Sequence, residues 1–138
     1  MVKVFIDTNI FLDLFLARGQ FADPAENLLG WCEKGFISGC TSSINITNIF
    51  YILRRQKTKS ETKRLISQLL GFIGVYGTSK TDLLLAMQSN FSDIEDAIQY
   101  YTALNAGDVN FIITRNIKDF KNSVIPYLLP EDFIKKFS

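Results

Sequence analysis

Acidic and amide side chains in three separate segments are the residues of this sequence best suited to chemistry. They are Asp7, the pair Asp93 and Asp96, and, further along the chain, Asn116 and Asp119. Carboxylate and amide oxygens are the ligands that hard cations such as Mg²⁺ and Mn²⁺ prefer. The pattern therefore favours metal-supported chemistry, and by itself it does not choose a substrate.

The sequence contains no histidine. Ser-His-Asp triads, Cys-His pairs and the common zinc sites all need an imidazole, so these mechanisms are excluded. Two cysteines, Cys32 and Cys40, cannot build a four-thiolate metal site, and they lack the spacing of a redox pair. We expect both to be small core residues.

Composition predicts a single folded domain over residues 1–138. Of its 138 residues, 47% are hydrophobic and 21% are charged, a balance that can bury a full core. Fifteen Lys and Arg against fourteen Asp and Glu give a formal net charge of +1, which favours neither nucleic-acid nor membrane binding. No apolar run could span a bilayer, and the N-terminal segment does not resemble a secretory signal. We therefore expect a cytoplasmic protein that does not bind membranes.

Short apolar strands alternate with helices along the chain, which predicts a parallel sheet covered on both faces. Strands are expected at residues 2–6, 36–40, 73–76 and 111–114, with a short last one at 124–125. Helices are expected to begin near residues 10, 24, 43, 59, 79 and 93. Their expected ends lie near residues 19, 35, 55, 71, 88 and 107. Pro126 and Pro130 are expected to break the tail.

Three of these helices carry a start signal. Asp23 is expected to cap a helix with Pro24 at its first position, and Thr58 and Ser92 are expected to open capping boxes. In the last of these boxes Glu95 would bond back to Ser92. The helix that follows is expected to bury Ile94, Ala97, Ile98, Tyr101 and Leu104.

The candidate residues follow the strands or lie at the start of a helix, and ligands of parallel sheets bind beyond the carboxyl ends of the strands. Asp7 would stand at this edge, where Thr8 and Asn9 could orient it. A buried Asp7 would need partners or a cation. Ordinary roles stay open for the other acids: Asp93 as a first-turn helix acid, Asp119 as a turn residue, and Asp13 as a local cap or ion pair.

Three motifs of this sequence resemble those of the PIN domain, the fold of the VapC-type toxin ribonucleases. They are VFIDTNIFLD at residues 4–13, DIEDAIQY at 93–100 and FIITRNIKDF at 111–120. Their order and spacing match the family over essentially the whole chain. The resemblance implies a three-layer α/β/α sandwich with a mostly parallel central sheet. It also implies an endoribonuclease that uses one or two Mg²⁺ or Mn²⁺ ions.

The resemblance also implies roles for individual residues. Asp7 and Asp96 match family acids and would hold the metal, with Asp119 completing the coordination directly or through water; these three are the expected catalytic residues. Asn48 and Asn116 stand where the family usually has acids, so both depart from its pattern. Supporting roles fall to Thr8, Asn9, Asn48, Asp93, Thr114 and Asn116.

Cations and aromatic rings supply candidates for RNA contact. Six of the fifteen Lys and Arg residues fall within residues 54–64, a segment that could hold the phosphate backbone or be an ordinary solvated surface. The candidates are Arg54, Arg55, Lys57 and, within the third motif, Arg115, which is the best single candidate for a phosphate contact. Tyr100 and Tyr101 could stack on bases, although Tyr101 falls on the expected apolar face.

The leading hypothesis is a metal-dependent endoribonuclease in which water attacks an RNA phosphodiester in line, with the toxin of a toxin-antitoxin pair as one biological setting. Two alternatives stay open. One is a PIN-fold RNA-binding or protein-interaction module whose catalysis is weakened by Asn48 and Asn116. The other is a structure-specific nuclease that acts on single-stranded DNA. An antitoxin protein and a second copy of the chain are further partners that the resemblance implies.

Overall fold

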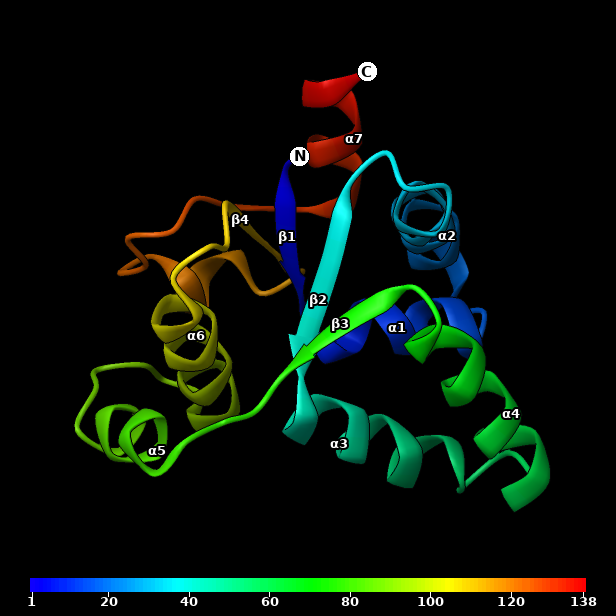
Figure 1. Cartoon of the computed structure of the whole chain (residues 1–138), viewed down its shortest axis with the longest axis horizontal. Helices are drawn as coiled ribbons and strands as arrows, with labels where there is room; N and C mark the ends of the chain where they lie inside the picture. The colour runs from blue at the N-terminus through cyan, green and yellow to red at the C-terminus, as the bar shows by residue number, and fades with distance from the viewer.

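A five-stranded parallel sheet forms the centre of the computed structural model, which describes all residues, Met1–Ser138 (Figure 1). Its strands are β1 (Lys3–Ile6), β2 (Ser38–Ser42), β3 (Ile73–Tyr76), β4 (Phe111–Ile113) and β5 (Tyr127–Leu128). Their order is β3-β2-β1-β4-β5, and every neighbouring pair is parallel. The expected α/β architecture is confirmed, and the first strand of the chain lies in the middle of the sheet.

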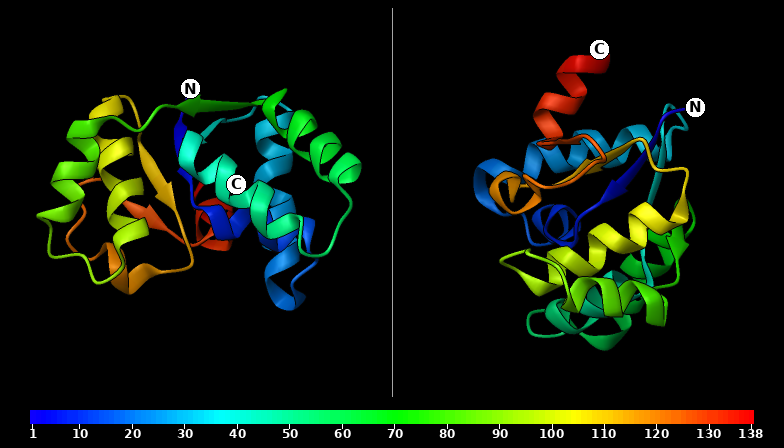
Figure 2. Two further views of the ribbon diagram at one scale, coloured as in Figure 1. Left: turned by 90° about the horizontal axis from the view of Figure 1, so that it is seen from below. Right: turned by 90° about the vertical axis from the view of Figure 1, so that its left-hand side faces the viewer.

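Seven α-helices and two short 3-10 helices connect the strands. They are α1 (Thr8–Phe15), η1 (Gly19–Phe21), α2 (Ala22–Glu33), α3 (Ser43–Leu53), α4 (Lys59–Leu70), α5 (Lys80–Met87), α6 (Ile94–Ala106), η2 (Ile117–Phe120) and α7 (Pro130–Phe137). Figure 2 shows α2 and α7 on one side of the sheet and α5 and α6 on the other. None of the helices has the length and apolar character needed to cross a membrane.

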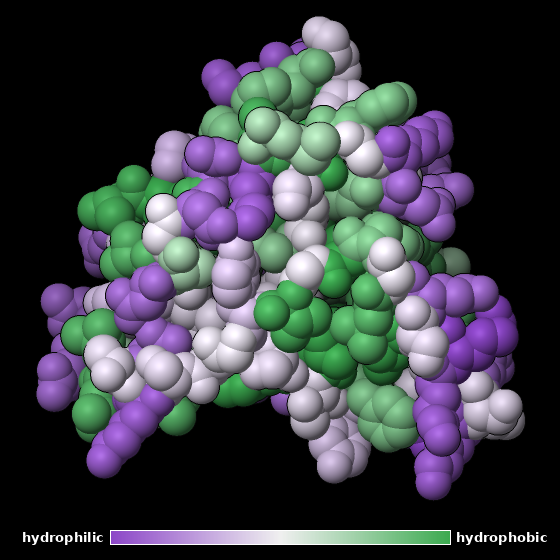
Figure 3. All heavy atoms as spheres, viewed as in Figure 1, coloured by the Kyte–Doolittle hydropathy of each residue, from purple (hydrophilic) through white to green (hydrophobic).

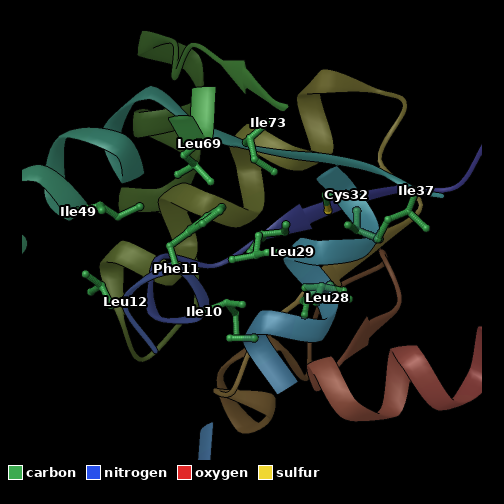
Figure 4. Packing of buried hydrophobic residues seen from close by; sticks show 14 of the residues in the cluster. Ile10, Phe11, Leu12, Leu28, Leu29, Cys32, Ile37, Ile49, Leu69 and Ile73 are labelled. Atoms are coloured by element: carbon green, nitrogen blue, oxygen red, sulfur yellow. The ribbon is translucent and has the colours of Figure 1, made fainter. Parts of the chain in front are cut away.

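Alternate side chains of β1 point to opposite faces of the sheet, as a strand requires. Val4 and Ile6 belong to the larger core, which is built mainly from α1, α2, α3 and α4. Figure 4 shows side chains of α1 and α2 packed with Ile49 of α3 and Leu69 of α4. Phe5 belongs to the smaller core under α6. Cys32 and Cys40 are buried and free, as expected.

Gly39 in β2 marks the closest approach of a helix to the sheet. A Cβ atom at this position would lie 2.6 Å from Sγ of Cys32 in α2 and 2.8 Å from Cδ1 of Ile73 in β3. Such separations are well inside van der Waals contact, so only glycine fits here without a shift of its neighbours. The glycine thereby sets how closely α2 packs on the sheet.

Two of the expected helix starts are wrong. The 3-10 turn η1 runs directly into α2 at Ala22, so the chain is already helical before Asp23, which lies in the first turn and caps nothing. Asp93, and not Ser92, caps α6, because its side chain accepts from the backbone N–H of Asp96 at 3.1 Å. Glu95 therefore has no capping role. The caps at Thr58 and at Gly107, which adopts φ 84°, are confirmed.

The buried face of α6 is rotated from the expected one. Asp96, Gln99 and Tyr100 are buried, whereas Ile94 is 44% exposed. Ile98, Tyr101 and Leu104, expected in the core, are only partly buried, and Ala97 is buried as expected. The rotation follows from the polar side chains, which turn toward the edge of the sheet where other polar groups satisfy them.

Strand limits and the tail also differ from expectation. β2 begins two residues late, because Ser38 pairs in register with Lys3 while the ring of Phe36 leaves the sheet to pack edge-on against Trp31. The last strand is Tyr127–Leu128 and not residues 124–125, since Tyr127 aligns with Ile112 of β4. Pro130 opens α7 at its first turn, where its missing N–H costs nothing, and does not break the tail.

The edge strand β3 leaves apolar surface uncovered. Val75 in this strand is 43% exposed. Figure 3 shows the apolar area over β3 beside the hydrophilic surface of α4 at the lower right.

Candidate active site

Asp7 lies at the carboxyl end of β1 and is 2% exposed. Because β1 and β4 are neighbours, Thr114 reaches it from the end of β4: the Thr114 hydroxyl donates to Oδ2 of Asp7 at 2.7 Å. Asp7 also caps α1, where its Oδ1 accepts from the backbone N–H of Asn9 at 3.4 Å. Asp7 is thus held by the helix that it begins and by a strand more than one hundred residues later.

Helix α6 brings a second carboxylate, Asp96, to the same edge. The side chain of Gln99, one turn further along α6, donates to Oδ1 of Asp7 at 3.1 Å and to Oδ1 of Asp96 at 3.5 Å. Asn116, after β4, donates from Nδ2 to Oδ2 of Asp96 at 3.3 Å. The first and second motifs of the sequence therefore meet, and neutral donors join their carboxylates.

Burial makes it costly for both carboxylates to be charged. Desolvation raises the pKa of Asp7, and the hydrogen bonds from Thr114 and Gln99 oppose this rise only in part. Burial, the neighbouring charge of Asp7 and the nearby carboxyl of Asp119 raise the pKa of Asp96 to about 8. Two crowded carboxylates with raised pKa values form the kind of site that a bound cation relieves.

A pocket of about 300 Å³ opens in front of these carboxylates. Asp7, Asp96 and Asn116 line one part of it, and Asn48 lines another from α3. Thr8, Asn9 and Asp93 also line the pocket, so most of the expected supporting residues lie together. Asn48 thus lines the same pocket as the carboxylates, at the position where the family usually has an acid.

The donor set of the pocket fits a hard divalent cation. The pocket lining includes four carboxylates, those of Asp7, Asp93, Glu95 and Asp96, and the amide side chains of Asn48 and Asn116, with no thiol or imidazole. No three acidic or thiol groups come close enough to hold a metal ion between them. Asp119, in η2, lies beside Asp96 of α6 but does not line the pocket. Of the three acids expected to hold the metal, Asp7 and Asp96 therefore line the pocket, and Asp119 contacts Asp96 from outside it.

Arg115 forms an ion pair with Asp13. Its Nε donates to Oδ2 of Asp13 at 2.7 Å and its terminal nitrogen to Oδ1 at 3.0 Å, while its guanidinium stacks 4.0 Å from the ring of Phe21. Asp13 is buried and also lies 3.6 Å from Arg18. The local pair expected at Asp13 is confirmed with Arg18, and Asp13 pairs with Arg115 as well. Asp13 and Arg115 pair with each other across 102 positions because α1 and the loop after β4 lie side by side. A phosphate contact at Arg115 stays a prediction.

The basic segment touches the pocket at one point. Arg55 lines the pocket, whereas Arg54 donates to the backbone oxygen of Lys57, and Lys57 pairs with Glu61 at 3.5 Å. Tyr51, one turn before Arg55, also lines the pocket and is 66% exposed.

Base stacking by Tyr100 is a wrong expectation. Its ring is buried in the smaller core, and its hydroxyl accepts from the backbone N–H of Val124. Tyr101 packs edge-on against it and is half-buried. Tyr51, which sequence reasoning passed over, is the exposed aromatic residue of the pocket.

Gln99 and Asn45 are the buried polar residues that the sequence did not reveal. Gln99 stands three residues after Asp96, the spacing that puts two side chains on one helix face, and this was the available signal. Asn45 stands three residues before Asn48 and donates to Oε1 of Gln99 at 2.8 Å.

Comparison with known proteins gives consistent matches. A family model described as PIN domain matches residues 3–118. Ribonuclease VapC1 of Aquifex aeolicus (strain VF5) is 28% identical over 141 residues, which cover 99% of this chain and 96% of that protein.

Among solved structures, a toxin-antitoxin complex from Klebsiella pneumoniae has 24% identity and a TM-score of 0.67, covering 92% of this chain and 97% of that one. VapBC2 from Rickettsia felis, bound to a DNA fragment from its promoter, has 17% identity and a TM-score of 0.68, covering 93% and 98%. These structures share the fold described above.

Proposed function

The chain belongs to the PIN domain family, and from this membership and the acidic pocket we propose that it is an endoribonuclease dependent on a divalent cation. The observation that carries the proposal is the pair of buried carboxylates, Asp7 and Asp96, facing an open pocket at the carboxyl edge of the sheet. Its similarity to Ribonuclease VapC1 over almost the whole chain supports RNA as the substrate.

Each residue of the pocket has a proposed task. Asp7 and Asp96 would hold Mg²⁺ or Mn²⁺. Asp119 would contact Asp96 from outside the pocket or contribute to the coordination through a water. When bound, such a cation lowers the pKa of a water molecule and neutralises charge on the phosphate. Thr114 fixes one oxygen of Asp7, and Asn116 fixes one oxygen of Asp96.

The proposed RNA contacts lie at the C-terminal end of α3 and in the turn that follows it. Arg55 would hold a backbone phosphate, and Arg54 and Lys57 would extend the positive surface. Tyr51 offers an exposed ring on which a base beside the cleaved bond could stack. Tyr51 lies in the last turn of α3 and Arg55 lies two residues after its end, and both line the pocket, so both can reach the same nucleotide step.

An antitoxin protein is the proposed protein partner. A groove of about 1010 Å³ runs between α1, α2 and α4 beside α7, and apolar side chains such as Leu14, Leu65 and Phe72 line it. Structural relatives are toxin-antitoxin complexes, which supports a partner of this kind.

Cleavage of mixed pools tests the proposed activity. Purified protein is incubated with RNA and single-stranded DNA of random sequence, with Mn²⁺, with Mg²⁺ and with EDTA. We expect cleavage of RNA alone, only with metal, and loss of this cleavage in Asp7→Asn. Cleavage of DNA would favour the alternative nuclease. RNA binding without cleavage at any metal concentration would favour the binding module.

A further inference from the structure

Gln99 is the side chain that donates to both carboxylates of the pocket, and the tasks above leave it unexplained. It is 5% exposed and lies on α6 one turn after Asp96. Thr114 donates to Asp7 and Asn116 donates to Asp96, but Gln99 joins the two acids through one amide nitrogen. The distance between the carboxylates therefore depends on this amide.

The orientation of the Gln99 amide follows from what surrounds it. Carboxylates that hold a cation are ionised and can only accept hydrogen bonds, so in that state the NH₂ end must face Asp7 and Asp96. The oxygen end then faces Asn45, whose Nδ2 donates to it at 2.8 Å and also donates to Oγ1 of Thr41 at 3.0 Å. The Thr41 hydroxyl in turn donates to the backbone oxygen of Ile6 at 2.9 Å. Residues of three elements thus hold the amide one way round.

We propose that Gln99 is a positioning residue for the metal site, and that Asn45 fixes its amide so that the NH₂ end sets the separation of the Asp7 and Asp96 carboxylates. This inference rests on the proposed function. Each carboxylate oxygen has two lone pairs. Oδ2 of Asp7 accepts only from Thr114, and Oδ2 of Asp96 accepts from Asn116. Each of these oxygens therefore keeps a lone pair for a cation while Gln99 binds the Oδ1 atoms. The NH₂ group therefore orders the ligands and does not displace the ion.

Titration with Mn²⁺ alone, followed by calorimetry, tests this role. Gln99→Met keeps the length of the side chain and removes the amide. Partners of ligating carboxylates typically matter by 10- to 100-fold in metal affinity, so we expect Mn²⁺ to bind Gln99→Met about 10- to 100-fold more weakly. The matched control is Gln88→Met, an exposed glutamine at the end of α5, which should bind Mn²⁺ as the wild type does. At subsaturating Mn²⁺, kcat should fall with the metal affinity, while KM for RNA stays unchanged.

Asn45 supplies a second test that does not depend on the Gln99 variant alone. Asn45→Asp places an acceptor opposite Gln99, which should turn the amide so that its oxygen faces Asp7 and Asp96. We expect Mn²⁺ affinity to fall as far as in Gln99→Met, although Asn45 contacts neither acid. In the Gln99→Met background the same change should add nothing, because the amide that it acts on is gone.

The outcomes separate this inference from the proposed function. If wild-type protein binds no Mn²⁺ and cleaves no RNA, both are overturned. If wild-type protein binds and cleaves, but Gln99→Met binds Mn²⁺ equally well or more tightly, the inference alone fails. Losses of affinity that add up in the double variant would likewise assign Asn45 a separate role and overturn it.

Discussion

Asp7 and Asp96 place their charges in a part of the protein that water barely reaches. A desolvated carboxylate next to another one is less stable ionised than in the unfolded chain, and neutral donors recover only part of that cost. The metal-free protein therefore carries a stability penalty at its own active site. A proton or a divalent cation relieves this penalty, and only the cation would serve the proposed reaction.

The pH dependence of stability follows from these raised pKa values. The unfolded pKa of an aspartate is about 4, whereas that of Asp96 in the folded protein is about 8. Between these two pKa values the folded state holds a proton that the unfolded state has lost. The contribution of Asp96 to the free energy of unfolding is therefore full below about pH 4 and disappears as the pH rises through about 8. We expect the Tm of wild type in EDTA to fall between pH 5 and pH 9. Asp96→Asn should flatten this decline, and an equally steep decline in that variant would contradict the assignment.

Asn48 is the position where an acid can be restored. Asn48→Glu adds an anionic oxygen to a pocket that prefers hard cations, so Mn²⁺ or Mg²⁺ should bind more tightly. It should also lower the Tm of the metal-free protein slightly, because another carboxylate joins those that already line the pocket. Calorimetric titration paired with melting curves in EDTA measures both effects, which have opposite signs. Unchanged metal affinity would remove position 48 from the site.

The candidate site was only partly predictable at this scale. Asp7 and Asp96 stand in motifs with fixed spacing, Asn48 was placed by its resemblance to a family position, and the structure brings all three to one pocket. Gln99 and Asn45 could not be paired from the sequence, because 54 residues separate them and a buried amide has the same local pattern as a surface one. Arg115 stands inside a site motif, yet in the folded protein its guanidinium pairs with Asp13.

A few long-range polar contacts connect helices and loops of this protein. Helix limits with side-chain caps, such as Thr58, were visible in the sequence because the signal is local. The start of α2 was not, because a preceding 3-10 turn supplied the helical entry. Contacts between distant elements depend on the three-dimensional arrangement. Two regions where such elements meet have testable consequences.

The Asp13–Arg115 pair is one such contact, between α1 and the loop after β4. The Arg115 side chain is 25% exposed, and Asp13 also lies 3.6 Å from Arg18, so the loss of one partner leaves neither charge both buried and unpaired. We expect Asp13→Asn and Arg115→Met each to lower the free energy of unfolding by roughly 1–3 kcal/mol, and the double variant to lose less than the sum. Denaturant melts measure this. An Arg115→Met variant of normal stability but weakened RNA binding would return Arg115 to phosphate contact.

The C-terminal end of α3 and the turn after it are the second case, because Tyr51 and Arg55 line the pocket from there. Stacking of a base on an aromatic ring contributes roughly 1–3 kcal/mol, so Tyr51→Ala should weaken RNA binding by about 5- to 100-fold while Tyr51→Phe preserves it. Arg55→Gln should reduce the salt dependence of binding by about one phosphate contact. Fluorescence anisotropy with a catalytically inactive Asp7→Asn background gives both values. Equal effects from Arg64→Gln, which lies outside the pocket, would argue for a diffuse basic surface.

The arrangement of the whole molecule puts the two proposed functions on different surfaces. The acidic pocket opens at the carboxyl edge of the sheet, and the apolar groove lies between α1, α2 and α4. The sequence predicted a parallel sheet covered on both faces but not its strand order, since every order satisfies the same local pattern. The groove was equally hidden, because it forms where helices from distant parts of the chain leave a gap. Homodimerisation stays a prediction.

The groove should be separable from the active site by mutation. Leu65→Glu places a charge on a half-buried groove position, so it should disrupt the complex with an antitoxin encoded by an adjacent gene. Ribonuclease activity of the free protein should be unchanged. Leu70→Glu on the same helix, outside the groove, is the matched control. Co-purification after joint expression measures the complex, and loss of binding in the control variant alone would place the partner elsewhere.

The central position of β1 also governs when activity can arise during synthesis. β1 is the first strand to leave the ribosome, but its neighbour β4 begins at Phe111, and Thr114, which orients Asp7, comes later still. Domains generally fold as units. In a nascent chain that ends before β4, β1 can pair with β2 but not with β4, and the pocket is incomplete. A ribosome making this protein is therefore not exposed to its nuclease until translation is nearly finished. By then most of the groove is already made, and a waiting partner can bind it as soon as the fold closes.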